Sequence, residues 1–304
     1  MKIESVGIYG LGKMGKNIAL NMLRNGYGVI AYNRSEAPRK EVSKKGAIEA
    51  HSIEDLVKKL ERPRVIWLML PSGNATEEAA AKLATVLEQG DIIIDGSNSM
   101  YKDTARRHDM LGKRGISMLD AGCSGGPSGA LNGMCIMVGG EREAYNELEE
   151  FLKRLSAKDG LLYTGRAGSG HFVKMVHNAI EYGFMQSLAE GAELLDRGPY
   201  GDLDMKSIFK LWNNGSVIRS YLVELSAKAM QDYPGLDGVE PYVEDSGEGR
   251  WSVDTAVEYS IPLHVISNSL FERFSSRSRR RVSNRLLAAL RLEFGGHRIN
   301  NGDE

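Results

Sequence analysis

A glycine-rich turn between a short apolar strand pattern and an amphipathic helix pattern constrains the fold more than any other feature of the chain. The strand pattern covers residues 6–9, and apolar residues recur at helical spacing after the turn. In such a turn the first glycine allows a tight bend, the second lets the backbone approach a pyrophosphate, and the third allows close helix packing. The helix N-terminus then offers free N–H groups to phosphates. We therefore predict that a dinucleotide binds at Gly10, Leu11, Gly12, Lys13, Met14 and Gly15.

Strand and helix patterns alternate over the first half of the chain. Helices are expected at residues 53–60 and 76–87, among others, and the alternation predicts a mostly parallel sheet with helices on both faces. Beyond residue 170 long helical patterns replace the strand signals. The predicted fold is α/β, with a Rossmann-type doubly wound sheet in residues 1–166 and an all-α domain in residues 167–304. Strands are expected at residues 6–9, 29–32, 65–70, 92–95, 117–120, 135–138 and 161–164.

Length and charge limit the classes of partner. The 304 residues are 42% hydrophobic and 26% charged, with a formal net charge of −1. A chain of this length can form two domains with separate cores. The near-neutral charge argues against whole-protein attraction to nucleic acid or to an acidic membrane.

The cellular compartment is inferred from the cysteines and the N-terminus. Cys123 and Cys135 are too few for a disulfide framework and have no second pair of ligands at metal-site spacing. The first residues enter a strand without a secretory leader, and no run approaches the ~18 apolar residues of a membrane span. We expect a cytoplasmic protein without a bound metal.

The residues after the second predicted strand indicate which dinucleotide is used. An acidic residue there would accept hydrogen bonds from the ribose hydroxyls of NAD, but this chain has Asn33, Arg34 and Ser35. Arg34 can stack on the adenine and bind a 2′-phosphate, with Ser35 donating a hydrogen bond. We predict NADP. NAD is the alternative, because Glu36 follows and would serve NAD if its side chain turned inward.

Residues 171–186 carry the most informative helical pattern of the second half. Lys174, His177, Asn178 and Glu181 fall within about a third of the helix circumference, with Lys174 and Glu181 about 10 Å apart along the axis. Lys174 and Glu181 are either a structural ion pair on a solvated helix face or a general base and a general acid. Much of the helix is expected to be buried, because its apolar residues should pack in the protein interior. These residues are Phe172, Val173, Met175, Val176, Ile180 and Phe184.

Several blocks of sequence occur together with the glycine turn and this helix. They are residues 94–99, which follow a strand, the glycine-rich turn 123–126, and residues 291–297 near the end. Together these motifs resemble the decarboxylating 6-phosphogluconate dehydrogenases. The resemblance covers nearly the whole chain, and HFVKMVHNAIEYG is its most specific part. The length resembles the short form of that family.

The resemblance implies a reaction and two catalytic residues. Lys174 would be the general base that takes the proton of the substrate C3 hydroxyl while hydride leaves C3 for NADP. The resulting β-keto acid would lose carbon dioxide. Glu181 would then protonate C1 of the enediol, which gives ribulose 5-phosphate in the pentose phosphate pathway.

The resemblance also implies substrate contacts and shared sites. The sugar acid would be lined by Asn98, which also borders the cofactor, and by Ser124, Gly125, Gly126, His177 and Asn178. From the residues alone, the alternative role of Asn98 is to cap a helix, and the alternative for His177 is a core histidine. The candidates for the phosphate end are Tyr182, Arg273, Arg291 and His297. The last two would reach across from a neighbouring subunit, which implies a homodimer or homotetramer.

The chain departs from the family pattern at several positions. Ser97 stands where a second glycine is usual, and Pro127 stands where a larger side chain is common. Ser246 and Glu248 occupy places where longer members carry a lysine and a threonine that bind phosphate. Ser246 or Arg250 would have to compensate, so these departures bear on the phosphate contacts.

Two other functions are compatible with the same fold. A β-hydroxyacid dehydrogenase or semialdehyde reductase shares the glycine turn and the helical lysine, but it lacks an acid at the position of Glu181 and releases no carbon dioxide. A non-catalytic NADPH-binding protein would need neither Lys174 nor Glu181.

Overall fold

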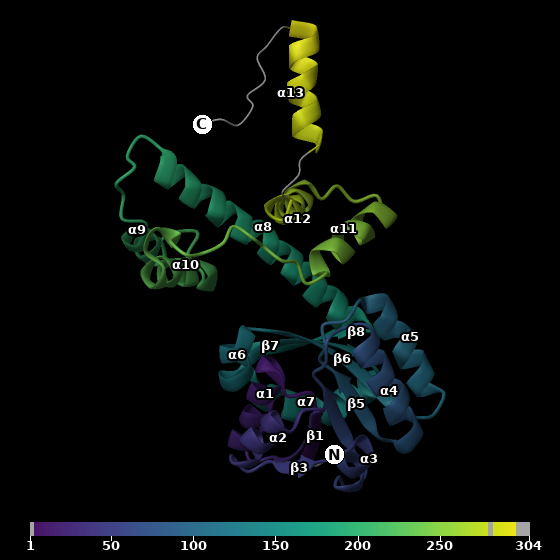
Figure 1. Cartoon of the computed structure of the whole chain (residues 1–304). Helices are drawn as coiled ribbons and strands as arrows, with labels where there is room; N and C mark the ends of the chain where they lie inside the picture. The colour runs from purple at the N-terminus through teal and green to yellow at the C-terminus, as the bar shows by residue number, and fades with distance from the viewer. Residues whose placement is uncertain (1–2, 279–281, 296–304) are drawn as a thin grey trace. The chain divides into compact units, whose positions relative to one another are not determined.

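The computed structural model describes residues 3–278 and 282–295 (Figure 1). Contacts within the chain divide it into two compact units, Met1–Asn178 and Ala179–Glu304. The first unit is built around a sheet and the second contains helices, which confirms the predicted fold class. Within the first unit, β8 ends at Gly165 and α8 begins at Ser169.

Eight strands of the described chain form one sheet in the order β3-β2-β1-β4-β5-β6-β7-β8. Neighbouring strands are parallel except β6 and β7, which are antiparallel. The central strands β4 and β5 are buried along their whole length, as expected for a sheet covered on both faces. The strands are β1 (Ser5–Tyr9), β2 (Gly28–Tyr32), β3 (Ile48–Ala50), β4 (Val65–Leu68), β5 (Ile92–Asp95), β6 (Ser117–Ser124), β7 (Met134–Gly140) and β8 (Ser156–Gly165).

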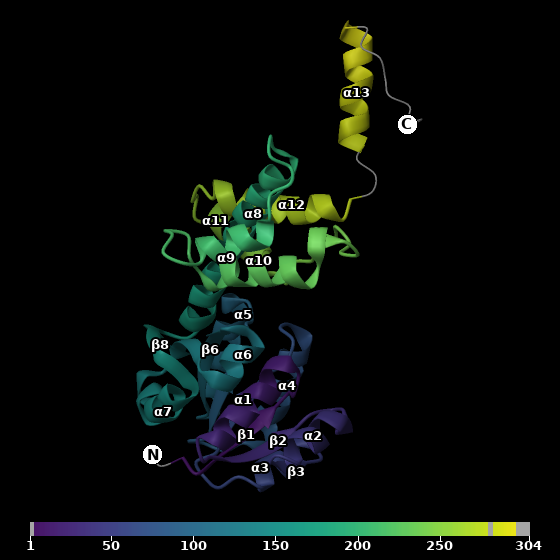
Figure 2. The same cartoon turned by 90° about the vertical axis from the view of Figure 1, so that its left-hand side faces the viewer.

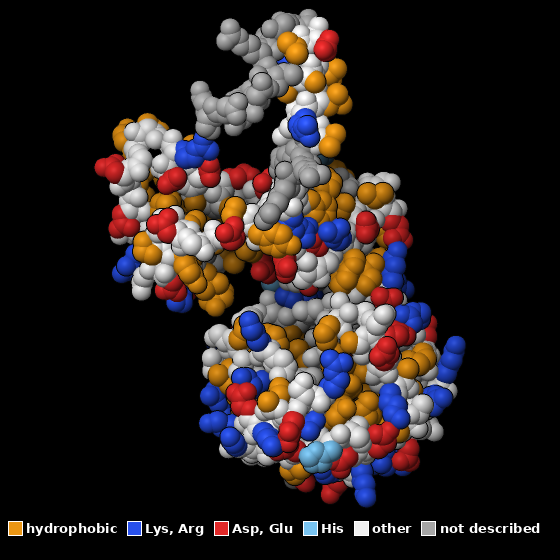
Figure 3. Space-filling view, viewed as in Figure 1, with side chains coloured by type: hydrophobic (Ala, Val, Ile, Leu, Met, Phe, Trp, Pro, Cys, Tyr) orange, Lys and Arg blue, Asp and Glu red, His pale blue; other side chains and the backbone are white. Residues whose placement is uncertain are grey.

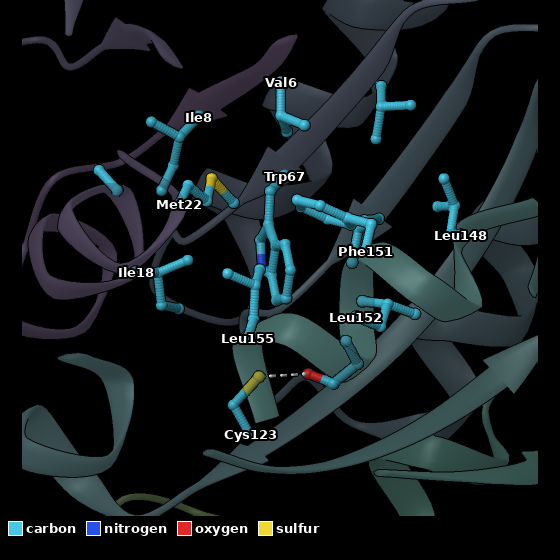
Figure 4. Packing of buried hydrophobic residues seen from close by; sticks show 14 of the residues in the cluster. Val6, Ile8, Ile18, Met22, Trp67, Cys123, Leu148, Phe151, Leu152 and Leu155 are labelled. Carbon is cyan, nitrogen blue, oxygen red and sulfur yellow. Dashed lines mark hydrogen bonds between the residues drawn. The ribbon is translucent and has the colours of Figure 1, made fainter. Parts of the chain in front are cut away.

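Helices cover the sheet in two layers, each with its own core. On one face, α1, α6 and α7 pack on the strands around the indole of Trp67, whose ring lies 6.1 Å from that of Phe151 (Figure 4). On the other face, α3, α4 and α5 pack on Ile66, Leu68 and Ile93. The helices of this unit are α1 (Lys13–Arg24), α2 (Glu36–Ser43), α3 (Ile53–Lys58), α4 (Asn74–Val86), α5 (Tyr101–Gly112), α6 (Gly126–Asn132) and α7 (Arg142–Leu155).

The long helix α8 (Ser169–Arg197) begins in the first unit and continues into the second. In the second unit, α9 and α10 lie side by side (Figure 2), and Phe209 of α9 is buried. The stretch from Tyr233 to Gly249 contains one short 3-10 helix and the start of α11. No helix in the described ranges is long and apolar enough to cross a membrane. The remaining helices are α9 (Met205–Trp212), α10 (Tyr221–Asp232), η1 (Pro234–Leu236), α11 (Glu248–Glu258), α12 (His264–Ser276) and α13 (Val282–Gly295).

Candidate active site

The glycine turn joins β1 to α1 at the carboxyl end of the parallel strands. Gly10 has a φ of 104°, in the left-handed region that favours glycine. A Cβ at Gly10 would overlap the carbonyl of Met69, and a Cβ at Gly15 would overlap the carbonyl oxygen of Gly10. A Cβ at Gly12 would meet no described atom within 4 Å. Gly10 and Gly15 are therefore required by packing, whereas Gly12 leaves open space at the N-terminus of α1, which suits a pyrophosphate.

The end of β2 is tied to this turn. The backbone N–H of Leu11 donates to Oδ1 of Asn33 at 3.0 Å, and the guanidinium of Arg39 donates to the carbonyl oxygen of Asn33 at 2.7 Å. Arg34 and Ser35 follow and are exposed. Glu36 is paired with Lys40 at 2.8 Å on the surface of α2. Asn33 thus fixes the turn, while Arg34 is accessible to a ligand.

The turn after β5 is held by a buried ion pair. Arg107 of α5 donates to Oδ2 of Asp95 at 3.1 Å, and both side chains are at most 1% exposed. The hydroxyl of Ser97 donates to Asp95 and lies 3.0 Å from that of Ser99. Asn98 has a φ of 48°, and its Oδ1 is buried without a described hydrogen-bond partner. A buried acceptor in a strained turn is available to a ligand.

Strand β6 carries the next group of predicted site residues. At its end the hydroxyl of Ser124 lies 3.2 Å from Nε2 of His177 on α8. Gly125 and Gly126 follow with φ values of 114° and 60° and turn the chain into α6. A Cβ at Gly122 would overlap Cβ of Lys174, so β6 and α8 are in close contact.

Lys174 is the buried centre of this group, with 5% of its surface exposed. Its ammonium lies 3.4 Å from Nδ1 of His177, which lies 3.1 Å from Oδ1 of Asn178. The structure therefore brings Lys174, His177, Asn178 and Ser124 into one connected set at the end of β6. A buried ammonium with polar neighbours is suited to proton transfer.

The expected burial of the apolar residues of α8 is correct for Met175, which is 2% exposed, but wrong for four of the others. Phe172, Val173 and Val176 are 37–39% exposed and Ile180 is 58% exposed, whereas Lys174 and His171 are buried. The polar side of the helix faces β6, because the small residue Gly122 there admits the long stem of Lys174. Phe172, Val173, Val176 and Ile180 consequently lie at the surface of the chain.

Glu181 lies on α8 seven residues after Lys174 and is half-buried. Seven residues of a continuous α-helix advance about 10 Å and return to within about 20° of the starting direction. Lys174 and Glu181 therefore project from the same side of α8.

In the second unit, Ser246 and Arg273 contact Tyr182. Its hydroxyl accepts a hydrogen bond from the backbone N–H of Ser246 at 3.0 Å, and the guanidinium of Arg273 stacks on its ring at 3.6 Å. Arg273 also donates to the carbonyl oxygen of Glu244 at 2.7 Å. The hydroxyl of Ser246 donates to the carboxylate of Glu248. Tyr182 and Arg273, both predicted to bind the substrate phosphate, are thus neighbours.

Arg250, the other residue considered for the phosphate, is engaged elsewhere. It forms two hydrogen bonds to Asp245, at 2.8 and 3.0 Å, and Arg277 forms a third at 2.8 Å. Hydrogen bonding to these arginines lowers the pKa of Asp245 to about 2. Arg291 lies exposed on α13, and His297 lies outside the described residues.

Comparisons with known proteins identify the family. Residues 5–165 match the model of the NAD binding domain of 6-phosphogluconate dehydrogenase, and residues 170–299 match that of its C-terminal domain. The chain belongs to the 6-phosphogluconate dehydrogenase family. This confirms the resemblance seen in the sequence motifs.

Relatives in this family use either cofactor. The chain is 40% identical to the NAD(+)-dependent, decarboxylating 6-phosphogluconate dehydrogenase of Haloferax volcanii, over 98% of this chain and 99% of that protein. It is 39% identical to the NADP(+)-dependent enzyme of Bacillus subtilis, over 91% of this chain and 62% of that protein. The family therefore supports a nicotinamide dinucleotide without deciding between NAD and NADP.

Solved structures agree with this assignment. The 6-phosphogluconate dehydrogenase of Plasmodium falciparum, solved alone, with NADP+ and with 6-phosphogluconate, matches with a TM-score of 0.83 and 30% identity. The match covers 99% of this chain and 67% of that chain. A 3-hydroxyisobutyrate dehydrogenase from Salmonella typhimurium, at 21% identity and a TM-score of 0.76, shares the fold.

Several residues that build the site of this family member were not predicted from the sequence. They include Asp95 and Arg107 beneath the Asn98 turn, and Asp120 beneath α8. The available signal was an aspartate inside or at the end of an apolar strand pattern, since a buried carboxylate needs a partner. In the described part of the chain, no three His, Cys, Asp or Glu side chains are grouped to hold a metal ion.

Proposed function

We propose that the protein catalyses the oxidative decarboxylation of 6-phosphogluconate to ribulose 5-phosphate and carbon dioxide, with reduction of NADP. The observation that carries the proposal is the buried Lys174, connected to His177 and Ser124 at the end of β6 in a chain of this family. Glu181 projects from the same side of α8. We also propose that the activity belongs to the pentose phosphate pathway in the cytoplasm. The proposed boundary between the two domains lies between residues 166 and 167.

Lys174 is the proposed general base. Its neutral amine takes the proton of the C3 hydroxyl while the C3 hydride leaves, and the nicotinamide, when bound, accepts that hydride. The product is a 3-keto acid, and its C1–C2 bond breaks with release of carbon dioxide because the ketone accepts the electron pair. Lys174, now protonated, donates a hydrogen bond to the C3 oxygen and stabilises the enolate that forms.

Glu181 is the proposed general acid of the last step. Decarboxylation leaves an enediol whose terminal carbon, C1 of the product, must gain a proton. A protonated carboxyl on the same side of α8, about 10 Å along the axis from Lys174, matches a substrate whose reacting carbons lie between the two groups. The result is ribulose 5-phosphate.

Two groups of residues are proposed to bind the substrate. Asn98, Ser124, Gly125, Gly126, His177 and Asn178 would bind the carboxylate and hydroxyls, and the buried Oδ1 of Asn98 supports this role because it has no described partner. Tyr182 and Arg273 would bind the phosphate, because they are in contact and arginine suits a bidentate phosphate contact. Arg291 and His297 are proposed for the same end.

NADP is the proposed cofactor. Arg34 is exposed beside the glycine turn and can bind a 2′-phosphate. Glu36, the residue that would favour NAD, is paired with Lys40. The test is kcat/KM with NADP and with NAD for the native protein and for Arg34→Ala. A native preference for NAD, or an unchanged ratio in Arg34→Ala, contradicts the role of Arg34.

A homo-oligomer with shared C-terminal residues is also proposed. Hydrophobic side chains are exposed along part of α13 (Figure 3), where Val282, Leu286 and Leu287 are at least 57% exposed. In the second unit, a cavity of about 540 Å³ lined mostly by apolar residues lies among α8, α9 and α10. Exposed apolar helices of this kind favour association.

The deciding experiment measures carbon dioxide. The protein is incubated with NADP and 6-phosphogluconate, and NADPH and carbon dioxide are quantified together. Equal amounts support the proposal. Oxidation of 3-hydroxyisobutyrate without carbon dioxide would identify a β-hydroxyacid dehydrogenase, and NADPH binding without turnover on any sugar acid would identify a non-catalytic binding protein.

A further inference from the structure

Three alternate residues of β6 contact successive positions along α8. Asp120, Gly122 and Ser124 share one face of the strand, because side chains alternate between the faces. Asp120 binds the backbone of the first turn of α8, Gly122 lies against Lys174, and Ser124 lies 3.2 Å from His177. The strand and the helix are therefore held in one register.

Asp120 supplies the strongest contact in this register. Its side chain is buried, with 1% exposed. Oδ1 accepts a hydrogen bond from the backbone N–H of Gly168 at 2.8 Å, and Oδ2 accepts one from that of His171 at 2.8 Å. The first N–H groups of a helix have no partner within the helix, and a carboxylate there also stabilises the positive end of the helix dipole. Asp120 thus fixes the start of α8 from a neighbouring strand.

A second buried contact fixes the same turn from the other side. The Nδ1 atom of His171 lies 2.8 Å from the hydroxyl of Thr104 on α5, and Thr104 lies 3.4 Å from the guanidinium of Arg107. Arg107 is the residue that binds Asp95 beneath the Asn98 turn. The first turn of α8 is therefore clamped between β6 and α5, one turn before Lys174.

We propose that Asp120 is a positioning residue for Lys174. Asp120 acts by fixing the rotation of α8 about its axis and the distance of α8 from β6. The inference rests on the proposed function, because it concerns the base of that reaction. A displacement of about 1 Å in a reacting group can cost about 100-fold in rate. Loss of the Asp120 contacts should therefore slow the hydride step more than it weakens cofactor binding.

Asp91 provides a matched control for an effect on folding alone. It is fully buried, and its Oδ1 accepts from the backbone N–H of Arg64 at 2.8 Å. Its Oδ2 accepts from the backbone N–H of Glu88 at 2.9 Å and from the guanidinium of Arg64 at 3.0 Å, so Asp91→Asn disturbs at least two buried backbone contacts and also an ion pair. It precedes β5 and so lies at the amino end of the parallel strands, opposite the proposed site. Asp→Asn at either position leaves one acceptor oxygen and places an NH2 group against a backbone N–H.

The experiment compares Asp120→Asn with Asp91→Asn in the full chain. Steady-state rates are measured with ordinary 6-phosphogluconate and with substrate deuterated at C3. We expect Asp120→Asn to lower kcat by about 10- to 100-fold, with an increased deuterium isotope effect and an NADP KM within about threefold of native. Asp91→Asn should lower the unfolding midpoint similarly but leave kcat within about threefold of native. If Asp120→Asn is insoluble, Asp120→Ser replaces it.

Hydrogen exchange gives a readout that does not depend on activity. Amides of residues 169–178 should exchange faster in Asp120→Asn than in Asp91→Asn, because only the first variant loosens the start of α8. Equal exchange in this segment, or a kcat no lower than that of Asp91→Asn, overturns the proposal. So does a loss confined to KM with an unchanged isotope effect. A native protein that fails to oxidise 6-phosphogluconate refutes the proposed function instead, and the exchange comparison then decides the role of Asp120 in placing α8.

Discussion

Gly122 of β6 and Lys174 of α8 are in such close contact that any side chain at position 122 would overlap Cβ of the lysine. The same hypothetical Cβ would lie 2.8 Å from the carbonyl oxygen of Gly170. The absence of a side chain at residue 122 therefore lets a lysine stem pack directly on a strand. The buried position of the proposed base follows from this contact.

We expect Gly122→Ala to impair both stability and turnover. Overpacking at a tight contact costs about 1–3 kcal/mol in the free energy of unfolding, and the lysine must move to relieve the overlap. Urea unfolding and kcat measure the two effects. Gly112→Ala is the control, because a Cβ there meets nothing within 4 Å and alanine favours the helix by up to about 1 kcal/mol. Equal stability and kcat in the two variants would contradict the contact argument.

The three glycines of the dinucleotide turn should differ in their response to substitution. Gly12→Ala should change the free energy of unfolding by less than about 1 kcal/mol, because its Cβ position is open. The new methyl group should obstruct the pyrophosphate and weaken NADPH binding by about tenfold or more. A tenfold loss of affinity is about the free energy of one hydrogen bond to a charged group. NADPH fluorescence titration and urea unfolding separate the two effects.

Gly10→Ala is the contrasting variant for that prediction. Its positive φ and the nearby Met69 carbonyl should make it destabilised even without cofactor. If Gly12→Ala were as unstable as Gly10→Ala, or bound NADPH with native affinity, Gly12 would have no special role toward the cofactor.

The sheet was largely predictable because its strands are runs of apolar residues between turn signals. The predicted strand at residues 92–95 is observed as β5 without change, and six other predicted strands are present with shifted ends. Strand β3 was missed because Ile48–Ala50 is short and lies at the edge of the sheet, where Ile48 is 55% exposed. Strand β6 was predicted to end at Asp120, because aspartate and glycine are depleted in strands.

The site was predictable only where a residue carries its own motif. Lys174 and the glycine turn belong to recognisable patterns, so they could be found in the sequence. Asp120 could not, because its meaning depends on α8 beginning beside β6, a contact between residues 48 positions apart in the chain. The orientation of α8 was misjudged for the same reason, since helical periodicity does not tell which side meets the sheet.

Lys174→Met should abolish most of the hydride transfer while leaving NADPH affinity close to native. Methionine fills a similar volume but cannot accept the proton of the C3 hydroxyl, and loss of a general base costs about 100- to 10,000-fold. Single-turnover reduction of NADP at saturating substrate measures the step. Native oxidation rates in this variant would remove Lys174 from the mechanism.

Glu181→Gln should affect a later step than Lys174→Met. The amide cannot protonate C1, so overall formation of ribulose 5-phosphate should slow while NADPH still binds. The rate of product formation as a function of pH, compared with the rate of NADP reduction, locates the defect. An unchanged pH profile and rate would show that another acid protonates C1.

His108 and Glu141 should make part of the stability of the first unit dependent on pH. Nε2 of His108 lies 2.9 Å from Oε1 of Glu141, and both side chains are partly buried. Hydrogen bonding to Glu141 raises the pKa of His108 above its usual 6.5. Burial alone would raise the pKa of Glu141, but its bonds to His108 and to backbone groups keep it below the usual value.

The sign of the effect follows from the raised pKa of the histidine. The folded state binds the His108 proton more tightly than the unfolded state, so this stabilisation is complete below about pH 6.5 and is lost as the pH rises through the folded pKa. The free energy of unfolding of the native protein should exceed that of His108→Gln by about 1 kcal/mol at pH 5.5 and by little at pH 9. Urea unfolding of both proteins at the two pH values tests this, and Glu141→Gln should reproduce the pattern. A native-to-variant difference that is the same at both pH values would rule out a charged His108–Glu141 pair as its source.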